Sequence, residues 1–345
     1  MVELNKKEKS ILRAIIRTFV KTAVPVGSIH LARKSGTGLK PASVRRLMAG
    51  LEEKGYLEHP HTSAGRVPTT AGYRYYVDRL VRVHKLQEPA ASMIMETIES
   101  YDGDVNLLME KVARVLASIS RQLGIIVTPR LYEGIFDRIQ IVPVATNKLM
   151  VVLSIHSGQI NTILMEVRQK VERKAIKQIV NRINQRFHGR PLRYIKDIFA
   201  DALADMKHEP NGLVQLFLDA SDRLFDFERF ENYAVTGTKN ILQQPEFSDL
   251  HRFSTLVDLL EDKNIIIHFM EQRENPPGIK VTIGEEHFEK QIKECSVITS
   301  TYRVGNIAGV LGIIGPRRIA YGKIIPLVEF TAQALTRHLS PSNMQ

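Results

Sequence analysis

Residues 36–80 read GTGLKPASVRRLMAGLEEKGYLEHPHTSAGRVPTTAGYRYYVDRL, and they predict a helix, a tight hairpin and a second helix in close succession. Pro41 suits the first turn of a helix, because its missing N–H would have no partner there. The apolar residues that recur at helical spacing predict a buried stripe, made of Val44, Leu47, Met48 and Leu51. Gly55 then predicts the end of this helix.

The other face of this helix carries small and basic side chains, which suit the major groove of DNA. Small residues let the backbone approach closely, and arginines bond guanine edges or phosphates. The residues expected to contact DNA from this helix and its start are Lys40, Ala42, Ser43, Arg45, Arg46 and Ala49. An ordinary amphipathic helix with surface arginines would show the same pattern, so the neighbouring segments must distinguish the two interpretations.

The segment after the helix has the pattern of a wing, which is an extended hairpin beside a helix-turn-helix. Leu57 lies in one arm, a tight loop follows, and Val67 starts the return. We expect Gly65 to permit an unusual backbone conformation, and Arg66 at the tip to reach phosphate or the minor groove. The wing residues expected to contact DNA are His61, Thr62, Ser63, Gly65 and Arg66.

Helices on both sides of this segment complete the pattern of a winged helix-turn-helix. Residues 6–22 place apolar side chains on one helix face, and a short second helix follows. Thr69 or Thr70 is expected to cap the helix that follows the wing. The tyrosines of that helix are expected to pack against the wing, with Tyr75 the one most free to face outward. This order of elements is specific, and we assign residues 1–87 to a DNA-binding domain.

The positive charge of the chain is concentrated in its first quarter. Residues 1–85 hold 17 Lys and Arg against 6 Asp and Glu, and the remaining 260 residues hold 31 of each. A localised basic patch is typical of phosphate contact, although a merely solvated basic surface would look the same. A membrane surface would also attract it, but these helices lack a broad Trp, Phe and Leu insertion face. We therefore predict nucleic acid, and no membrane, as the partner.

The rest of the composition is that of an ordinary globular protein of 345 residues. No apolar run approaches the roughly 18 residues that span a bilayer, and the N-terminus lacks the apolar core of a signal peptide. The single cysteine, Cys295, excludes an internal disulfide framework, fits a reducing cytoplasm and is expected to be structural. His59 and His61 lack a third ligand nearby, so we expect no metal site.

Beyond residue 104 the pattern predicts an α+β body. A long helix over 104–123 leads to a short buried strand at 124–128. Three extended runs then predict an antiparallel meander, followed by helices: strands at 136–144, 149–156 and 160–167, and helices at 170–187, 192–206 and 211–230. The last part predicts further strands and a final helix: strands at 233–237, 264–270, 279–283, 297–303 and 307–314, and a helix at 323–338. This order suggests one domain interrupted by another.

No segment has the pattern of a catalytic or cofactor site. The glycine-rich run GVLGIIG leads to Pro316 and not into a helix, so it is no phosphate loop, and its glycines are expected to serve a hairpin and tight strand packing. Glu285, Glu286 and His287 lie together without a partnered nucleophile, and they predict a polar turn. We therefore expect no catalytic residues and no cofactor.

Three stretches closely resemble the family of the heat-inducible transcription repressor HrcA. They are ASVRRLMAGLEEKGYLE (42–58), PHTSAGRVPTTAGYRYYVDRL (60–80) and CSVITSTYRVGNIAGVLGIIGPRRIAYGKIIPLVEFTAQAL (295–335), and in outline the resemblance covers the whole chain. It implies a dimeric bacterial repressor that binds an inverted-repeat operator in double-stranded DNA upstream of chaperone operons, and is then nucleoid-associated. It also implies release on heat shock and dependence on a GroE-type chaperonin.

The resemblance also implies a domain plan for the body. A GAF-like α/β domain would comprise residues 88–129 and 232–345, interrupted by an inserted α+β dimerisation domain at 130–231. The chain departs from the family pattern at Lys40, Arg46 and Leu47, where the family favours a small hydroxyl residue, Asn and an acidic residue. These departures bear on the identity of the operator half-site and not on DNA binding.

Two other functions stay open. A ligand-controlled regulator would hold a metabolite in the GAF-like core. An enzyme carrying a DNA-binding domain would need a phosphate loop or an acid–base constellation, and we find neither. We therefore predict a sequence-specific repressor that blocks a promoter sterically and is released when its C-terminal body loses its fold or its dimer geometry.

Overall fold

The computed structural model describes residues 2–34, 38–60, 65–101, 105–129, 134–156, 160–167, 171–204, 213–224, 233–272, 278–305 and 307–340. The chain forms two compact units. The first unit comprises residues 1–126, 233–301 and 310–334, and the second comprises 127–232, 302–309 and 335–345. Helices and sheets are mixed along the chain, which confirms the predicted α+β class. No helix of the described residues is long and apolar enough to cross a membrane.

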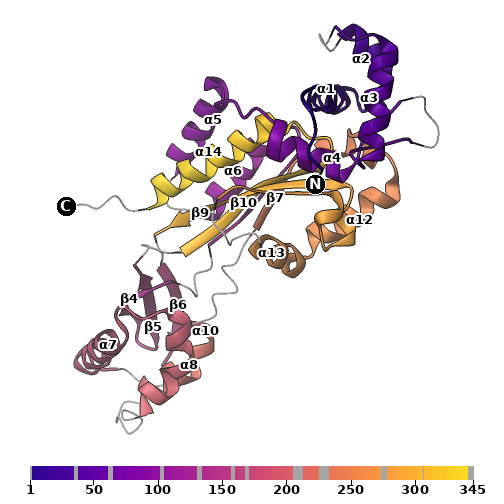
Figure 1. Cartoon of the computed structure of the whole chain (residues 1–345). Helices are drawn as coiled ribbons and strands as arrows, with labels where there is room; N and C mark the ends of the chain where they lie inside the picture. Colours follow the sequence, from indigo (N-terminus) through magenta and orange to yellow (C-terminus); the bar gives the residue numbers. More distant parts are fainter. Residues whose placement is uncertain are drawn as a thin grey trace. The chain divides into compact units, whose positions relative to one another are not determined.

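The N-terminal part of the first unit has the predicted order of elements (Figure 1). The helices and strands are α1 (Lys6–Thr22), α2 (Ser28–Lys34), α3 (Pro41–Glu53), β1 (Leu57–Glu58), β2 (Val67–Pro68) and α4 (Thr70–Tyr75). After Tyr75 the helix widens into a π-helical turn at Tyr76–Leu80, in which the N–H of Val81 bonds the carbonyl of Tyr76 at 2.7 Å.

Local sequence signals explain where these helices begin and end. The side chain of Asn5 accepts hydrogen bonds from backbone N–H groups in the first turn of α1. Pro41 begins α3, and Gly55 adopts the left-handed conformation just after its end, as predicted. Thr69 accepts a hydrogen bond from the N–H of Gly72 at 3.1 Å, and is therefore the cap of α4.

The C-terminal part is built on a five-stranded sheet with the order β7-β3-β10-β9-β8. Its strands are β3 (Leu123–Val127), β7 (Tyr233–Thr236), β8 (Lys280–Ile283), β9 (Cys295–Val304) and β10 (Ile307–Pro316). Figure 1 shows α6 (Val105–Ser120) and α14 (Tyr321–Leu339) above the sheet in that view, α13 (Lys263–Glu271) below it, and α12 (Leu250–Glu261) beside its right-hand end. A Cβ at Gly312 would lie 2.4 Å from the carbonyl oxygen of Ile298, so this glycine serves close strand packing, as predicted.

One predicted strand is wrong, and some helices were not predicted. Residues 264–270 form most of helix α13, because Ile266, Ile267, Phe269 and Met270 are buried at helical and not at alternating spacing. A short apolar run does not distinguish a buried helix from a buried strand by its periodicity alone. The helices that the sequence did not predict are α5 (Glu88–Glu99), α11 (Thr238–Leu242) and α12.

The second unit contains the predicted antiparallel meander, with strand order β4-β5-β6. Its strands are β4 (Phe136–Ala145), β5 (Lys148–Ile155) and β6 (Ile160–Glu166). The helices are α7 (Arg173–Phe187), α8 (Leu192–Ala202), α9 (Leu213–Asp219) and α10 (Ser221–Leu224), so the single helix predicted over 211–230 is two helices in its described part. Helix α7 packs against β4 and covers one face of the meander.

Candidate nucleic-acid interface

Helix α3 packs one face against α1 and α2 and leaves the other face open. Val44, Met48 and Leu51 are buried, as predicted, whereas Leu47 is only half-buried and lies at the border of the stripe. The buried face is therefore narrower than predicted, and the open face is correspondingly wider.

The open face carries most of the residues that the sequence singled out. Lys40, Ala42, Ser43, Arg45 and Arg46 are exposed, and Ala49 is half-buried. Within the described part of the chain, none of the three cations on this face forms an ion pair. Small side chains next to unpaired cations make a surface that a phosphate backbone or base edges can approach closely.

An ion pair anchors the other end of α3. The Nζ of Lys54 lies 2.7 Å from the Oε1 of Glu8, a buried residue in the first turn of α1. Burial alone would raise the pKa of Glu8, but the hydrogen bonds from Lys54 and from the N–H of Asn5 outweigh burial and lower it. The charged pair therefore holds α3 at a fixed position on α1.

The base of the wing is fixed by backbone contacts. β1 pairs with β2 through Leu57↔Pro68 and Glu58↔Val67. Val26 and Arg66 exchange two backbone hydrogen bonds of 2.9 and 3.0 Å. The conformation of Gly65 is not left-handed, contrary to the expectation of an unusual backbone; instead, a Cβ there would lie 2.6 Å from the carbonyl carbon of Pro25.

Arg66 lies at the base of the wing and not at its tip, which corrects its predicted position. Its Nε donates a hydrogen bond of 2.7 Å to the Oε2 of Glu52, near the end of α3, and its side chain is 20% exposed. The predicted wing residues His61, Thr62 and Ser63 lie outside the described residues. Arg66 therefore joins the wing to α3 in this structure.

The tyrosines after the wing pack inward, and the prediction for Tyr75 is wrong. Tyr75 is buried, its ring meets that of Tyr56 edge-on at 5.2 Å, and its hydroxyl accepts a hydrogen bond from the N–H of Leu4 at 3.3 Å. Tyr76, at the start of the π-helical turn, is the less buried neighbour.

Two arginines join these N-terminal helices to the rest of the first unit. Arg74 on α4 pairs with Glu286 through two hydrogen bonds, one of which measures 2.7 Å from Nε, and its Nη2 donates to the carbonyl oxygen of Val281 at 2.7 Å. Hydrogen bonding to Glu286 raises the pKa of the Arg74 guanidinium. Arg74 and Glu286 are 212 residues apart, so no local pattern could predict this contact.

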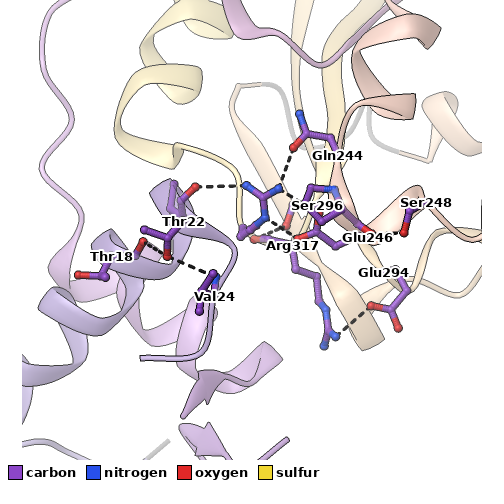
Figure 2. A network of polar contacts seen from close by, with 12 residues as sticks. Thr18, Thr22, Val24, Gln244, Glu246, Ser248, Glu294, Ser296 and Arg317 are labelled. Carbon is purple, nitrogen blue, oxygen red and sulfur yellow. Dashed lines mark hydrogen bonds and ion pairs between the residues drawn. The ribbon is translucent and has the colours of Figure 1, made fainter. Parts of the chain in front are cut away.

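Arg318 makes the second connection. Its guanidinium donates to both carboxylate oxygens of Glu246, to the side-chain oxygen of Gln244 at 2.8 Å and to the carbonyl oxygen of Val20 in α1 at 3.2 Å. Figure 2 shows Glu246 and Gln244 in this network beside the end of α1, and Arg317 paired with Glu294 close by. We call the Arg74 and Arg318 contacts together the arginine clamp.

The residues considered for catalysis have structural surroundings. Glu286 belongs to the arginine clamp, and Glu285 pairs with the Nζ of Lys293, so the predicted polar turn is formed. The ring of His287 is buried, with its Nε2 3.3 Å from the carbonyl oxygen of Cys295. Cys295 is fully buried, and burial raises the pKa of its thiol well above the ordinary value, which disfavours the reactive thiolate.

Comparison with known proteins places these features in a wider group. A family model described as HrcA protein C terminal domain matches residues 106–325. The heat-inducible transcription repressor HrcA of Chlorobium phaeobacteroides (strain BS1) is 36% identical, over 98% of this chain and 99% of its own length. The protein of the same name from Geobacter sulfurreducens (strain ATCC 51573 / DSM 12127 / PCA) is 34% identical, over 98% of this chain and 99% of its own.

A solved structure has the same overall fold. It is described as "Crystal structure of a hypothetical protein at 2.2 A resolution", and it aligns with a TM-score of 0.62 over 98% of this chain and 99% of its own, at 20% sequence identity. At this identity the likeness shows the fold alone.

Proposed function

The chain belongs to the HrcA family of heat-inducible transcription repressors, and from this premise we propose that it binds double-stranded DNA through a winged helix-turn-helix formed by α1 to α4 and the β1–β2 hairpin. The observation that carries the proposal is the open face of α3. There, cations that form no ion pair with any described residue stand beside small side chains, on a helix whose opposite face is buried.

Each residue of this face has a role in the proposal. Arg45 and Arg46 contact base edges or nearby phosphates, and Lys40 and Ser43 bind phosphate near the helix start. Ala42 and Ala49 allow the backbone to approach the groove. In the wing, His61, Thr62 and Ser63 contact DNA, while Gly65 lets the base of the wing pack against Pro25 and Arg66 joins the wing to α3.

We infer that the chain acts as a homodimer through the meander of the second unit. Val142, Met150 and Leu164 are cross-strand neighbours on the face opposite α7. The side chains of Val142 and Leu164 are 43% and 53% exposed. Because an exposed apolar patch marks an interaction surface, and because the family resemblance implies a dimer, a second copy is its proposed occupant.

The rest of the proposal follows from family membership. Residues 1–87 form the DNA-binding domain, residues 88–129 and 232–345 a GAF-like domain, and residues 130–231 the inserted dimerisation domain. The dimer presents two copies of α3 to the half-sites of an inverted-repeat operator upstream of chaperone operons. Heat releases it, and a GroE-type chaperonin restores its active fold.

The test is fluorescence anisotropy with two labelled duplexes, an inverted-repeat chaperone-promoter element and a shuffled control, across a salt series. We expect binding to the operator to be about 10³-fold tighter or more at physiological salt, with a steep salt dependence. Equal weak binding to both duplexes, unchanged after refolding with chaperonin and ATP, would contradict the proposal.

A second candidate function, control by a small anionic ligand, is favoured by one cavity. It has a volume of about 700 Å³ and lies between α1, the π-helical turn and the start of α14. Its described lining contains no carboxylate and includes five basic side chains, which are Arg13, Arg17, Lys21, Arg82 and Lys323. The Nε of Arg13 is buried without a hydrogen-bond partner among the described residues. The probe is ATP. This candidate would be supported if ATP raised the melting temperature of the protein and changed its affinity for the operator, and if both effects were absent in the variant Arg13→Gln/Arg17→Gln.

A further inference from the structure

Three potential metal ligands converge on the surface of the second unit, outside the proposed DNA-binding face. They are Asp137, His156 and His188, and each contributes one ligand atom to a group whose members lie within 4.8 Å of one another. The Nε2 of His156 is 3.9 Å, and the Nδ1 of His188 is 3.8 Å, from the Oδ1 of Asp137.

The protein core brings these residues together. Each of them directly follows a buried apolar residue, and these are Phe136 in β4, Ile155 in β5 and Phe187 in α7. Phe136 and Ile155 are cross-strand partners. The rings of Phe136 and Phe187 meet edge-on at 6.4 Å. Packing of the three core residues therefore places the next residue of each segment at the same edge of the unit.

Backbone hydrogen bonds hold the three segments in this arrangement. The N–H of His156 donates to the carbonyl of Ile135, and the N–H of Gly189 donates to the carbonyl of Phe136, both at 2.9 Å. The Nδ1 of His188 lies 2.7 Å from the carbonyl oxygen of Asp137, which places its ring beside the carboxylate. The site is thus supported by the backbone as well as by side-chain packing.

We propose that Asp137, His156 and His188 together bind one divalent transition-metal ion, for which Zn²⁺ is the probe. Two imidazoles and one carboxylate suit Zn²⁺, Co²⁺ or Ni²⁺, whereas Ca²⁺ and Mg²⁺ prefer oxygen ligands only. Metal–ligand bonds of about 2.0–2.2 Å in a tetrahedron require the ligand atoms to lie roughly 3.3–3.5 Å apart.

The side chains must rotate to reach that separation. Both imidazoles are exposed. His188 must release the hydrogen bond between its Nδ1 and the carbonyl oxygen of Asp137 for that nitrogen to bind the ion, while the backbone stays fixed by its own hydrogen bonds. Water completes the coordination. The ion joins β4, β5 and the end of α7, and binding it to the folded state stabilises the second unit. This site does not depend on the proposed DNA-binding function.

The experiment is a calorimetric titration of the tag-free full-length chain with Zn²⁺. A second titration uses Co²⁺, and its binding is followed by the visible absorption of the bound ion. The chain has 11 histidines, so background binding must be measured with a matched variant. The site variant is His156→Gln/His188→Gln. The control is His30→Gln/His84→Gln, which replaces two exposed histidines of the first unit.

We expect one equivalent of Zn²⁺ to bind the wild type and the control, and to raise their melting temperatures. The site variant should bind more than about 100-fold more weakly, since even residues that only orient metal ligands contribute about 10- to 100-fold. Asp137→Asn provides a second test that preserves side-chain size, and circular dichroism checks that each variant is folded. Equal Zn²⁺ binding by the wild type and both site variants, or no binding by the wild type, would overturn the proposal.

Discussion

At the residue scale, arginines of the same chemistry have different surroundings and therefore different expected roles. Arg45 and Arg46 extend from the open face of α3 and have no carboxylate partner among the described residues. Arg66 is paired with Glu52 and mostly buried. A free guanidinium can bond a base edge, whereas a paired one must first lose its carboxylate.

Arg45→Ala should lower the discrimination between operator and shuffled DNA by about 1–3 kcal/mol, because a bidentate contact to a base edge is lost. Binding to shuffled DNA should fall less. Anisotropy with both duplexes at one salt concentration measures the difference. Equal losses on the two duplexes would show that Arg45 contacts phosphate only.

Arg66→Ala and Glu52→Gln should both weaken operator binding, by roughly tenfold or less, because each removes one side of the ion pair that holds the wing on α3. The comparison separates two roles. If Arg66 instead bound phosphate directly, Glu52→Gln would free its charge and strengthen binding. Affinity measurements on both variants, with Glu58→Gln as an exposed control in β1, test this.

At the element scale, two sets of contacts join helices, strands and turns that no single sequence motif contains. The arginine clamp joins α4 and α1 to the turn at Gly284–Glu286 and to the segment before α12. The apolar patch of Val142, Met150 and Leu164 spans the three strands of the meander, and Val142 and Leu164 are exposed. We expect the first connection to orient the helices that are proposed to bind DNA, and the second is the proposed contact between copies.

Glu246→Ala should lower the free energy of unfolding by about 1–3 kcal/mol, because it leaves the largely buried Arg318 without its carboxylate partner. It should also speed tryptic cleavage after Arg82 and Lys85, in the segment without helix or strand that follows the π-helical turn. Chemical denaturation and timed proteolysis are the measurements. Glu285→Ala, which breaks an exposed pair, is the matched control and should change stability by less than about 1 kcal/mol. Unchanged proteolysis in Glu246→Ala would contradict the orienting role.

Leu164→Glu should weaken self-association by more than about tenfold, since a buried charge in an apolar contact costs well over 1.4 kcal/mol. Sedimentation across a concentration series measures it. Leu242→Glu is the control, because Leu242 is 48% exposed but lies in the first unit. A fully dimeric Leu164→Glu variant would place the dimer contact elsewhere.

At the scale of the whole molecule, the proposed thermal release rests on marginal stability. A native state whose free energy of unfolding is only about 5–15 kcal/mol can be lost over a narrow temperature range. Both proposed requirements for tight operator binding, two α3 helices and a dimer, depend on units that stay folded, and heating unfolds them.

Ile125→Val should lower the temperature at which operator DNA is released, in step with the melting temperature. Ile125 is fully buried in β3, and removing one methylene costs about 0.5–1.5 kcal/mol, or roughly 1–6 °C. Anisotropy of the operator complex and circular dichroism during heating give the two midpoints, with the exposed Val83→Ala as control. Full operator affinity well above the melting temperature would contradict release by unfolding.

The sequence alone determined the features that depend on neighbouring residues. Pro41, Gly55 and Thr69 mark helix ends through bonds within a few residues, and the alternation of the meander fixes its register. The open face of α3 and the concentration of positive charge follow in the same way, because periodicity and charge are local properties.

Only the tertiary structure decided what depends on packing between distant segments. Tyr75 is buried under the N-terminus, and residues 264–270 are helical, because contacts outside their own segments set their environment. Arg74 and Glu286 are far apart in the chain, as are Asp137, His156 and His188. Such groups meet because buried cores fix the position of each segment, and this long-range geometry leaves no periodic trace in the sequence.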